Sequence, residues 1–307
     1  QRMRILLTGA SGLFGLNFAT AYSGQHSITG VVNQQHLMDT PFQVVQVELS
    51  KAGAGSALVE QMRPDLIINC AALANLDKCE SSPDLAQRLN AELPGELAQA
   101  ARQVGAKLVH FSTDAVFDGQ RGNYSEDDTP APINVYSRTK LAGEVAVLAA
   151  NPGAIVARVN FYGFSLFGQR SLGEFFVYNL LARKNVMGFT DVFFCPLHVD
   201  QLARTLLRMA ALDLSGLFHV VSSQALSKYD FGIRIARQFG LDETLIQPVS
   251  WQDGGLKAAR SPKLTLRTEK TAQALGEPLP DVTSGVSRFF EQFEEGLPLR
   301  LRGFAGA

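Results

Sequence analysis

The first half of the chain alternates short apolar runs with longer segments of helical period, and this alternation constrains the fold most strongly. Strand and helix in strict succession require right-handed crossovers, which cover both faces of a parallel sheet. The sequence therefore predicts an α/β fold with a doubly wound parallel sheet. The predicted strands are 4–8, 28–32, 44–47, 66–69, 107–112 and 154–159, and the predicted helices between them are 13–22, 56–62, 83–104 and 137–149.

The second half loses this regularity. It contains a glycine- and aromatic-rich stretch at 161–176, two amphipathic helices at 201–211 and 229–239, and a turn-rich loop at 248–262. We expect the sheet domain to span 1–160, with a returning segment near 190–222. Segment 161–307 is expected to form mainly a smaller α/β domain, which closes over the carboxyl edge of the sheet, where open α/β folds bind ligands.

Composition excludes several classes of protein. With 28 basic and 29 acidic residues and a formal net charge of -1, the chain has no field to attract nucleic acid or an anionic membrane. No run approaches the roughly 20 apolar residues of a membrane span, and a predicted strand begins too early to leave room for a signal peptide. The three cysteines form no metal-binding motif and suit a reducing cytoplasm, so we expect a cytoplasmic protein without a metal. The oligomeric state stays open, with a homodimer as one option.

Three glycines, Gly9, Gly12 and Gly15, follow the first predicted strand and open the first predicted helix. A dinucleotide pyrophosphate needs a tight turn, close backbone approach and the partial positive charge of a helix N-terminus. Glycine turns of this kind are common, but this one starts a series of alternating strands and helices and so predicts an NAD(P)-binding Rossmann domain. The second strand ends at Asn33, where an acid would select NAD and a cation NADP. The cofactor is therefore NAD or NADP, with a mild preference expected.

Tyr136 and Lys140 stand one turn apart at the start of a predicted helix. A tyrosine with its ordinary pKa near 10 exchanges protons poorly at neutral pH, and a neighbouring ammonium favours its phenolate. We therefore expect Lys140 to lower the pKa of Tyr136. A tyrosine and a lysine also occur at this spacing by chance, but Thr113 follows the strand 107–112, where its hydroxyl could donate to the carbonyl oxygen that Tyr136 protonates.

Together with four further stretches, these motifs resemble the extended short-chain dehydrogenases, and more narrowly the dTDP-4-dehydrorhamnose reductases. The stretches are 69–72 (NCAA), 77–80 (DKCE), 112–119 (STDAVFDG) and 134–144 (NVYSRTKLAGE). The similarity is dense from residue 4 to residue 160 and thin afterwards. The resemblance implies Thr113, Tyr136 and Lys140 as catalytic residues, with Lys140 also bonding the nicotinamide ribose. Tyr136 and Lys140 also count as cofactor residues, and the others expected there are Gly9, Ser11, Gly12, Leu13, Phe14, Gly15, Asn33, Cys70, Ala71 and Ala72.

The substrate residues follow less directly. Reductases of this group usually carry Tyr where this chain has Ala115, and Arg-Pro where it has Arg260 followed by Ser261. Arg260 or Lys263 could still reach a substrate pyrophosphate. The substrate candidates are Asn90, Asp114, Ala115, His198 and Arg260.

The function that these observations favour is NAD(P)H-dependent reduction of a nucleotide-linked 4-keto-sugar, with Tyr136 as the proton donor. Two alternatives share the scaffold. One is an epimerase or dehydratase, which takes the hydride and later returns it. The other is a non-catalytic cofactor-binding subunit that resembles the β subunit of methionine adenosyltransferase. Fold alone does not separate the three.

Overall fold

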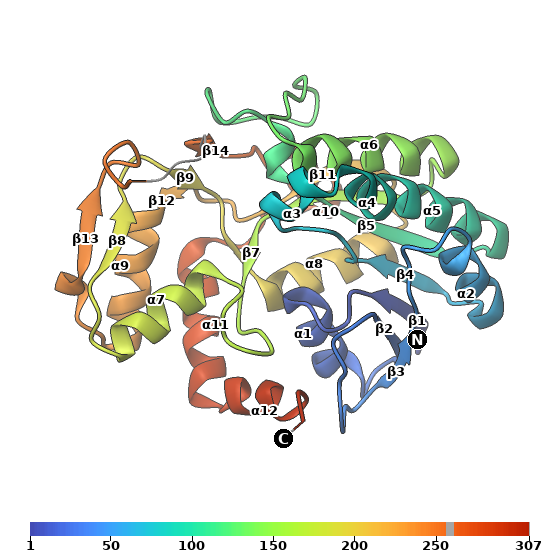
Figure 1. Cartoon of the computed structure of the whole chain (residues 1–307), viewed down its shortest axis with the longest axis horizontal. Coiled ribbons are helices and arrows are strands. Elements are labelled where there is room, and N and C mark those ends of the chain that lie inside the picture. Colours follow the sequence, from blue (N-terminus) through green and yellow to red (C-terminus); the bar gives the residue numbers. More distant parts are fainter. Residues whose placement is uncertain (256–260, 307) are drawn as a thin grey trace.

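A seven-stranded parallel sheet forms the centre of the protein (Figure 1), and the predicted fold class is confirmed. The structure is a computed structural model that describes residues 1–255 and 261–306. The strand order is β11-β6-β5-β4-β1-β2-β3, so the direction of winding reverses between β1 and β4. The bounds are β1 Arg4–Thr8, β2 Ser27–Val32, β3 Gln43–Gln46, β4 Leu66–Asn69, β5 Lys107–Thr113, β6 Ile155–Val159 and β11 Gly216–Val220.

Helices cover both faces of the sheet, because successive side chains of each strand point to opposite faces. In β1, Ile5 and Leu7 belong to one hydrophobic cluster and Leu6 belongs to another. Helices α1 and α8 contribute to the first cluster and α2, α5 and α6 to the second (Figure 1). Their bounds are α1 Leu13–Tyr22, α2 Ala54–Met62, α5 Leu93–Val104, α6 Val135–Ala150 and α8 Val199–Ala211.

The helix predicted for 83–104 is divided by one turn of wider pitch. Helix α4 (Pro83–Gln87) runs into the π-helical turn η1 (Arg88–Glu92), and α5 follows directly. Pro94 has no N–H to donate to the carbonyl of Asn90 four residues earlier, and the backbone N–H of Leu93 donates to Arg88 instead. The division places Asn90 inside the helix with its side chain fully buried.

The region after β6 packs small sheets of two or three strands against helices α7, α9 and α11, to one side of the large sheet (Figure 1). The chain returns to the large sheet once, when β11 pairs in parallel with β6. The elements of this region are β7 Phe161–Tyr162, α7 Leu172–Leu181, β8 Val186–Phe189, β9 Phe193–Phe194, β10 Leu197–His198, β12 Leu226–Ser227, α9 Lys228–Phe239, η3 Glu243–Leu245, β13 Ile246–Val249, β14 Lys263–Leu264, α10 Glu269–Leu275, α11 Val282–Glu294 and α12 Leu297–Gly303. The remaining short helices are α3 Leu76–Ser81 and η2 Asp114–Val116.

The described residues contain neither a candidate membrane span nor a candidate metal site. No helix among them is long and apolar enough to cross a membrane. Nor do residues 1–255 and 261–306 contain a group of three or more His, Cys, Asp or Glu side chains that could hold a metal ion.

Candidate active site

A cavity of about 480 Å³ lies at the carboxyl edge of the sheet, where β1 and β4 end. This is the position at which an open α/β sheet binds a dinucleotide, because the crossovers leave in opposite directions there. Eight of the predicted cofactor residues line this cavity: Gly9, Ser11, Gly12, Leu13, Asn33, Cys70, Ala71 and Ala72.

The glycines of the first turn are held tightly against β4 and the loop after it. The backbone of Gly9 has a φ of 68°, and a Cβ there would lie 3.0 Å from the carbonyl carbon of Cys70. A Cβ on Gly15 would lie 2.3 Å from the carbonyl oxygen of Gly9, so only glycine lets the helix approach the turn. The Thr8 hydroxyl, 2.6 Å from Asn69 Oδ1, also accepts the N–H of Cys70 and thereby fixes the far side of the cavity.

The N-terminus of α1 opens onto this cavity without a side-chain cap, since Gly12 is the N-cap residue. Uncapped N–H groups and the positive end of a helix suit a pyrophosphate. The residues present therefore fit a dinucleotide cofactor. Phe14 is a correction to the predicted set, because its ring is buried in the core against Phe111 and Phe18 and does not line the cavity.

The predicted catalytic residues meet beside this cavity. Thr113 ends β5, and Tyr136 and Lys140 lie in the first two turns of α6. Asn134 caps that helix by accepting the N–H of Ser137 at 2.8 Å, which sets where Tyr136 begins. The side chains of Thr113 and Tyr136 are close enough for the Thr113 hydroxyl to lower the pKa of Tyr136.

Lys140 is buried at 3 % exposure, and its ammonium donates to the carbonyl of Phe111 at 2.6 Å. Burial lowers the pKa of Lys140 to about 8, against the opposing effect of the Glu144 carboxylate. Burial also raises the pKa of Tyr136 to about 12, and the Thr113 hydroxyl offsets only part of this rise. The expectation that Lys140 lowers the pKa of Tyr136 is therefore wrong for this structure, because desolvation of the phenolate dominates.

A buried polar network lies behind Lys140. Glu144, one turn further along α6, accepts two hydrogen bonds from Arg158 at 2.8 and 2.9 Å and a third from Ser112. Arg158 in turn lies 3.2 Å from Nε2 of His219. Since Glu144 and Arg158 are almost fully buried, each charge depends on the other, and together they fix the strands next to Thr113.

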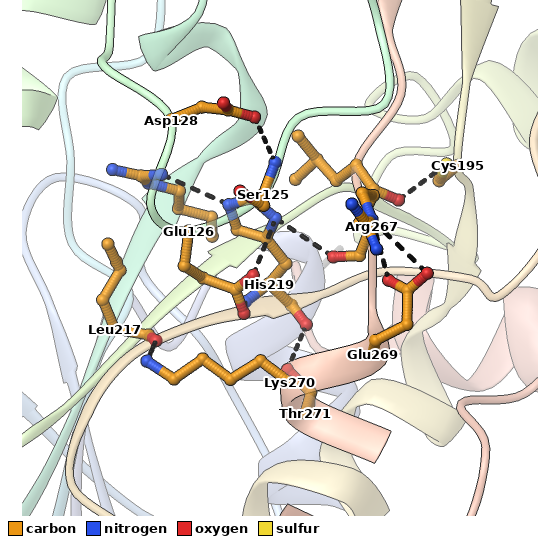
Figure 2. A network of polar contacts seen from close by, with 12 residues as sticks. Ser125, Glu126, Asp128, Cys195, Leu217, His219, Arg267, Glu269, Lys270 and Thr271 are labelled. Atoms are coloured by element: carbon orange, nitrogen blue, oxygen red, sulfur yellow. Dashed lines mark hydrogen bonds and ion pairs between the residues drawn. The ribbon is translucent and has the colours of Figure 1, made fainter. Parts of the chain in front are cut away.

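Figure 2 shows the polar contacts around His219, which include Glu126 of the loop before α6. The Glu126 carboxylate accepts the backbone N–H of His219 at 3.1 Å, and His219 Nδ1 lies 3.2 Å from the carbonyl oxygen of Arg267. Thr271 donates to the carbonyl of His219 at 2.7 Å. Burial lowers the pKa of His219 to about 3 and raises that of Glu126, so His219 is neutral. These bonds fasten the long loop before α6 to β11 and α10.

A second cavity of about 200 Å³ begins at Asp114, next to Thr113. Asp114 is 5 % exposed, and burial raises its pKa to about 6 although the Asn160 amide donates to it at 2.7 Å. Arg170 and Phe161 line both this cavity and the larger one, so the two are neighbours. The other residues of the second cavity are Tyr162, Ser171, Leu172, Val192, Phe193, Phe194, Lys228, Ser261 and Leu264.

Asn160, Arg170 and Lys228 are site residues that the sequence predictions missed. Asn160 directly follows the predicted strand 154–159, at the same edge as Thr113, so the strand-end rule could have found it. Arg170 and Lys228 are separated in sequence by helices α7 and α8 and strands β8 to β12, and no local signal brings them together.

The side chain of Asn90 forms hydrogen bonds within the protein. Its side-chain oxygen accepts the N–H of Leu73 at 2.8 Å, and its amide donates to the carbonyl of Leu73 and to Thr139. All these bonds tie the loop after β4 to α6. Asn90 therefore supports the cofactor cavity, and its polar atoms are already bonded to protein.

His198 is a correction among the substrate candidates. It is fully buried, accepts the N–H of Asp200 at the start of α8, and lies 3.1 Å from Gln292. Burial lowers its pKa to about 4, so it is a neutral core histidine that lines neither cavity.

The other substrate candidates lie near the second cavity or outside the described residues. The backbone N–H of Ala115 donates to the Thr113 hydroxyl at 3.1 Å, which orients that hydroxyl. Arg260 lies outside the described residues. Lys263 is exposed and does not line the second cavity, although Ser261 and Leu264 do.

The model of the RmlD substrate binding domain family matches residues 3–295 of this chain. A probable low-salt glycan biosynthesis reductase of Haloferax volcanii is 33% identical over 299 residues, which cover 95% of this chain and 99% of the relative. The β subunit of methionine adenosyltransferase 2 from Rattus norvegicus is 34% identical over 85% of this chain and 78% of its own. Among solved structures, dTDP-4-dehydrorhamnose reductase of Bacillus anthracis in complex with NADP superposes with a TM-score of 0.80 at 26% identity, covering 95% of this chain and 100% of that one.

Proposed function

The chain belongs to the RmlD substrate binding domain family and is an NAD(P)-dependent oxidoreductase, and on that premise we propose that it reduces a nucleotide-linked 4-keto-sugar to the corresponding hydroxy-sugar. The observation that carries the proposal is that Thr113, Tyr136 and Lys140 lie near one another, with Thr113 next to Asp114 of the second cavity and Lys140 close to Cys70 of the larger one. One cavity suits the dinucleotide. The other begins at Asp114 and is separate enough to take a second ligand.

We propose that residues 1–160 and the returning strand β11 hold mainly the cofactor. Gly9, Gly12 and the N-terminus of α1 would hold its pyrophosphate. Bound NAD(P)H supplies a hydride to the carbonyl carbon of the sugar. Residues after 160 would form most of the substrate site, beside Asn160 and Asp114.

Tyr136 supplies the proton in this mechanism. Its hydroxyl proton passes to the carbonyl oxygen as the hydride arrives at carbon, so that C=O becomes CH–OH and the phenolate is reprotonated from water. A reduction needs the protonated phenol, and the raised pKa of Tyr136 keeps that proton in place at neutral pH. The Thr113 hydroxyl would share the same oxygen, and the ammonium of Lys140 would offset the phenolate formed beside it.

The residue after Asp114 favours a single reduction over epimerisation or dehydration. Related dehydratases carry Glu there, and the fucose-forming epimerase-reductases carry Cys, each as a proton-transfer group. Ala115 has only a methyl group, and the side chain of His198 is buried and lines neither cavity. In the described structure, position 115 itself therefore supplies no acid or base.

A labelling experiment tests the proposal. The enzyme is given a nucleotide 4-keto-sugar and NADPH deuterated at the transferred position, and the product is examined by mass spectrometry and NMR. We expect one deuterium at the reduced carbon. In a parallel reaction with unlabelled NADPH in deuterated water, we expect no deuterium on neighbouring ring carbons. Solvent deuterium at those carbons, above an enzyme-free control, would overturn simple reduction.

The similarity to a methionine adenosyltransferase β subunit suggests a second candidate function, that of a non-catalytic subunit that binds the cofactor. A binding module has no need of a protonated phenol beside a threonine at a second cavity. We therefore favour the enzyme.

A cytoplasmic homodimer is part of the same proposal, and the three free cysteines suit a reducing compartment. Light scattering during gel filtration tests the dimer, which a monomer mass would refute.

A further inference from the structure

We propose that Arg170 and Lys228 bind the diphosphate of the nucleotide-linked substrate in the second cavity. This inference rests on the proposed function, since it names the residues that would hold its substrate. Both side chains line the cavity that begins at Asp114. The nucleotide would then extend past these two cations while the sugar lies near Thr113.

The charges of the cavity favour an anion. Arg170, Lys228 and Asp114 are the charged side chains among its described lining residues, so cations outnumber acids there. The chain as a whole has a net charge of -1, which makes this excess local. The raised pKa of Asp114, about 6, shows that its carboxylate is already poorly solvated. Guanidinium and ammonium groups are the usual protein partners of phosphate oxygens.

Two helix N-termini add to this field. Arg170 directly precedes Ser171, the N-cap of α7, and Lys228 is the first residue of α9. Ser171, Leu172 and Lys228 all line the cavity, so both helices begin at its wall. A cation at the positive end of a helix is unfavourable for that helix, and a bound dianion would offset both the cation and the helix end.

The backbone at both positions is fixed by hydrogen bonds. The N–H of Arg170 donates to the Glu174 carboxylate at 3.1 Å, inside the capping box that starts α7. The N–H of Lys228 donates to the carbonyl of Val192 at 2.9 Å, and its ammonium lies 6.0 Å from the centroid of the Phe194 ring. A binding site built this way needs little ordering of the backbone when the ligand arrives.

The diphosphate of the cofactor is the other source of the same chemistry. That group already has a place at Gly9, Gly12 and the N-terminus of α1, in the larger cavity. Lys228 lines the second cavity and not the larger one. Arg170 lines both and therefore marks the border between them. The geometry thus assigns the pair to the second ligand.

Calorimetric titration tests this assignment without turnover. The protein is saturated with NADP⁺, which occupies the cofactor site, and is titrated with dTDP and with UDP. We expect Arg170→Gln and Lys228→Gln each to raise the Kd of at least one of the two diphosphates by about tenfold or more, which corresponds to about 1.4 kcal/mol. Lys228→Arg, which keeps the charge, should retain most of the affinity. Arg300→Gln, an exposed arginine on α12, is the matched control.

Three outcomes would overturn the assignment: no binding of either diphosphate to the wild-type complex, unchanged affinities in both glutamine variants, or a loss confined to the cofactor. Circular dichroism of each variant verifies that it is folded. The test is independent of the proposed reaction. If diphosphate binding depends on Arg170 and Lys228 but the protein reduces no keto-sugar, the binding site is supported and the proposed function is refuted. If the protein reduces a keto-sugar but the variants bind dTDP and UDP as the wild type does, the function is supported and the binding site is refuted.

Discussion

Burial raises the pKa of Tyr136, the residue that the proposed mechanism uses as its proton donor. Its hydroxyl lies close to that of Thr113, while the ammonium of Lys140 donates to the backbone of Phe111. A pKa of about 12 would hinder an enzyme that must start from a phenolate, but it suits one that starts by giving a proton away. The direction of this shift therefore agrees with reduction as the working direction.

Tyr136→Phe should lower the rate of hydride transfer by at least about a hundredfold, because it removes a general acid whose contribution is of that order. The Kd of NADPH should change little, since the ring and its packing remain. Stopped-flow measurement of cofactor oxidation gives the rate, and cofactor fluorescence gives the Kd. Tyr22→Phe, a half-buried tyrosine on α1, is the control. A rate near that of the wild type would eliminate Tyr136 as the donor.

Lys140 should make folding stability depend on pH in a recognisable way. Its pKa falls from 10.5 to about 8 on folding, so the folded state binds this proton less tightly than the unfolded chain does. The resulting cost is fully present below about pH 8 and is relieved as pH rises towards 10.5. Lys140→Met loses this pH dependence, whereas the wild type gains stability as pH rises. The unfolding free energy of the variant minus that of the wild type should therefore fall by up to about 3 kcal/mol between pH 7 and pH 10.

Urea denaturation of the cofactor-free proteins at both pH values measures that difference, in which the other titrating groups cancel. A difference that is the same at both pH values would show that Lys140 is not a poorly solvated cation in the folded protein.

Residue types and their order were readable from the sequence, but burial was not. The spacing of Tyr136 and Lys140 correctly suggested that they share one helix, and the lysine was then assumed to control the tyrosine. In the folded protein, burial of the phenol raises the pKa of Tyr136, and a sequence does not show how much water a side chain loses on folding. The same limit explains Phe14 and His198, whose side chains are in the core.

At the scale of elements, the turn between β1 and α1 depends on close approach of two backbones. Gly15 lies against the carbonyl of Gly9, which in turn lies against the chain after β4. The turn, the helix N-terminus and the floor of the larger cavity thus form one rigid unit. The whole unit follows from three glycines, which is why the sequence predicted it well.

Gly15→Ala should disrupt this unit, because the added Cβ would lie 2.3 Å from the Gly9 oxygen and backbone atoms cannot move aside cheaply. We expect a loss of about 2 kcal/mol or more in unfolding free energy together with weaker NADPH binding. Gly24→Ala is the matched control, since a Cβ there meets nothing within 4 Å. Thermal unfolding and cofactor titration of both variants provide the readout, and equal behaviour of the two would contradict the packing described for Gly15.

Six of the seven strands of the large sheet were predicted to within one residue at each end, because apolar runs in a regular alternation carry their own signal. For β11 only a returning segment near 190–222 was expected. The wider turn around Asn90 was not predicted, although Pro94 is a visible cause. The strands β7, β9, β10, β12 and β14 have two residues each and exist only through their partners. Helices α7 and α11 were also missed. Distant contacts of this kind leave no period in the sequence.

At the scale of the whole molecule, two adjoining cavities are proposed to bind the two ligands, the larger one the cofactor and the smaller one the substrate. The larger one is built from the glycine turn and the ends of β1, β2 and β4. The smaller one is built from the region after β6, and Phe161 and Arg170 stand between them. Thr113 directly precedes Asp114, which lines the smaller cavity. In the proposed reaction the hydride would pass from the ligand of the larger cavity to that of the smaller one.

The most direct test of the account is a panel of nucleotide 4-keto-sugars offered with NADPH and with NADH, followed through the absorbance of the reduced nicotinamide. We expect the cofactor to be oxidised only when one of these sugars is present, with one equivalent of the hydroxy-sugar formed for each cofactor consumed. We expect this oxidation to disappear in Tyr136→Phe. Tight cofactor binding with no oxidation by any member of the panel would contradict it and would point to a cofactor-binding subunit instead.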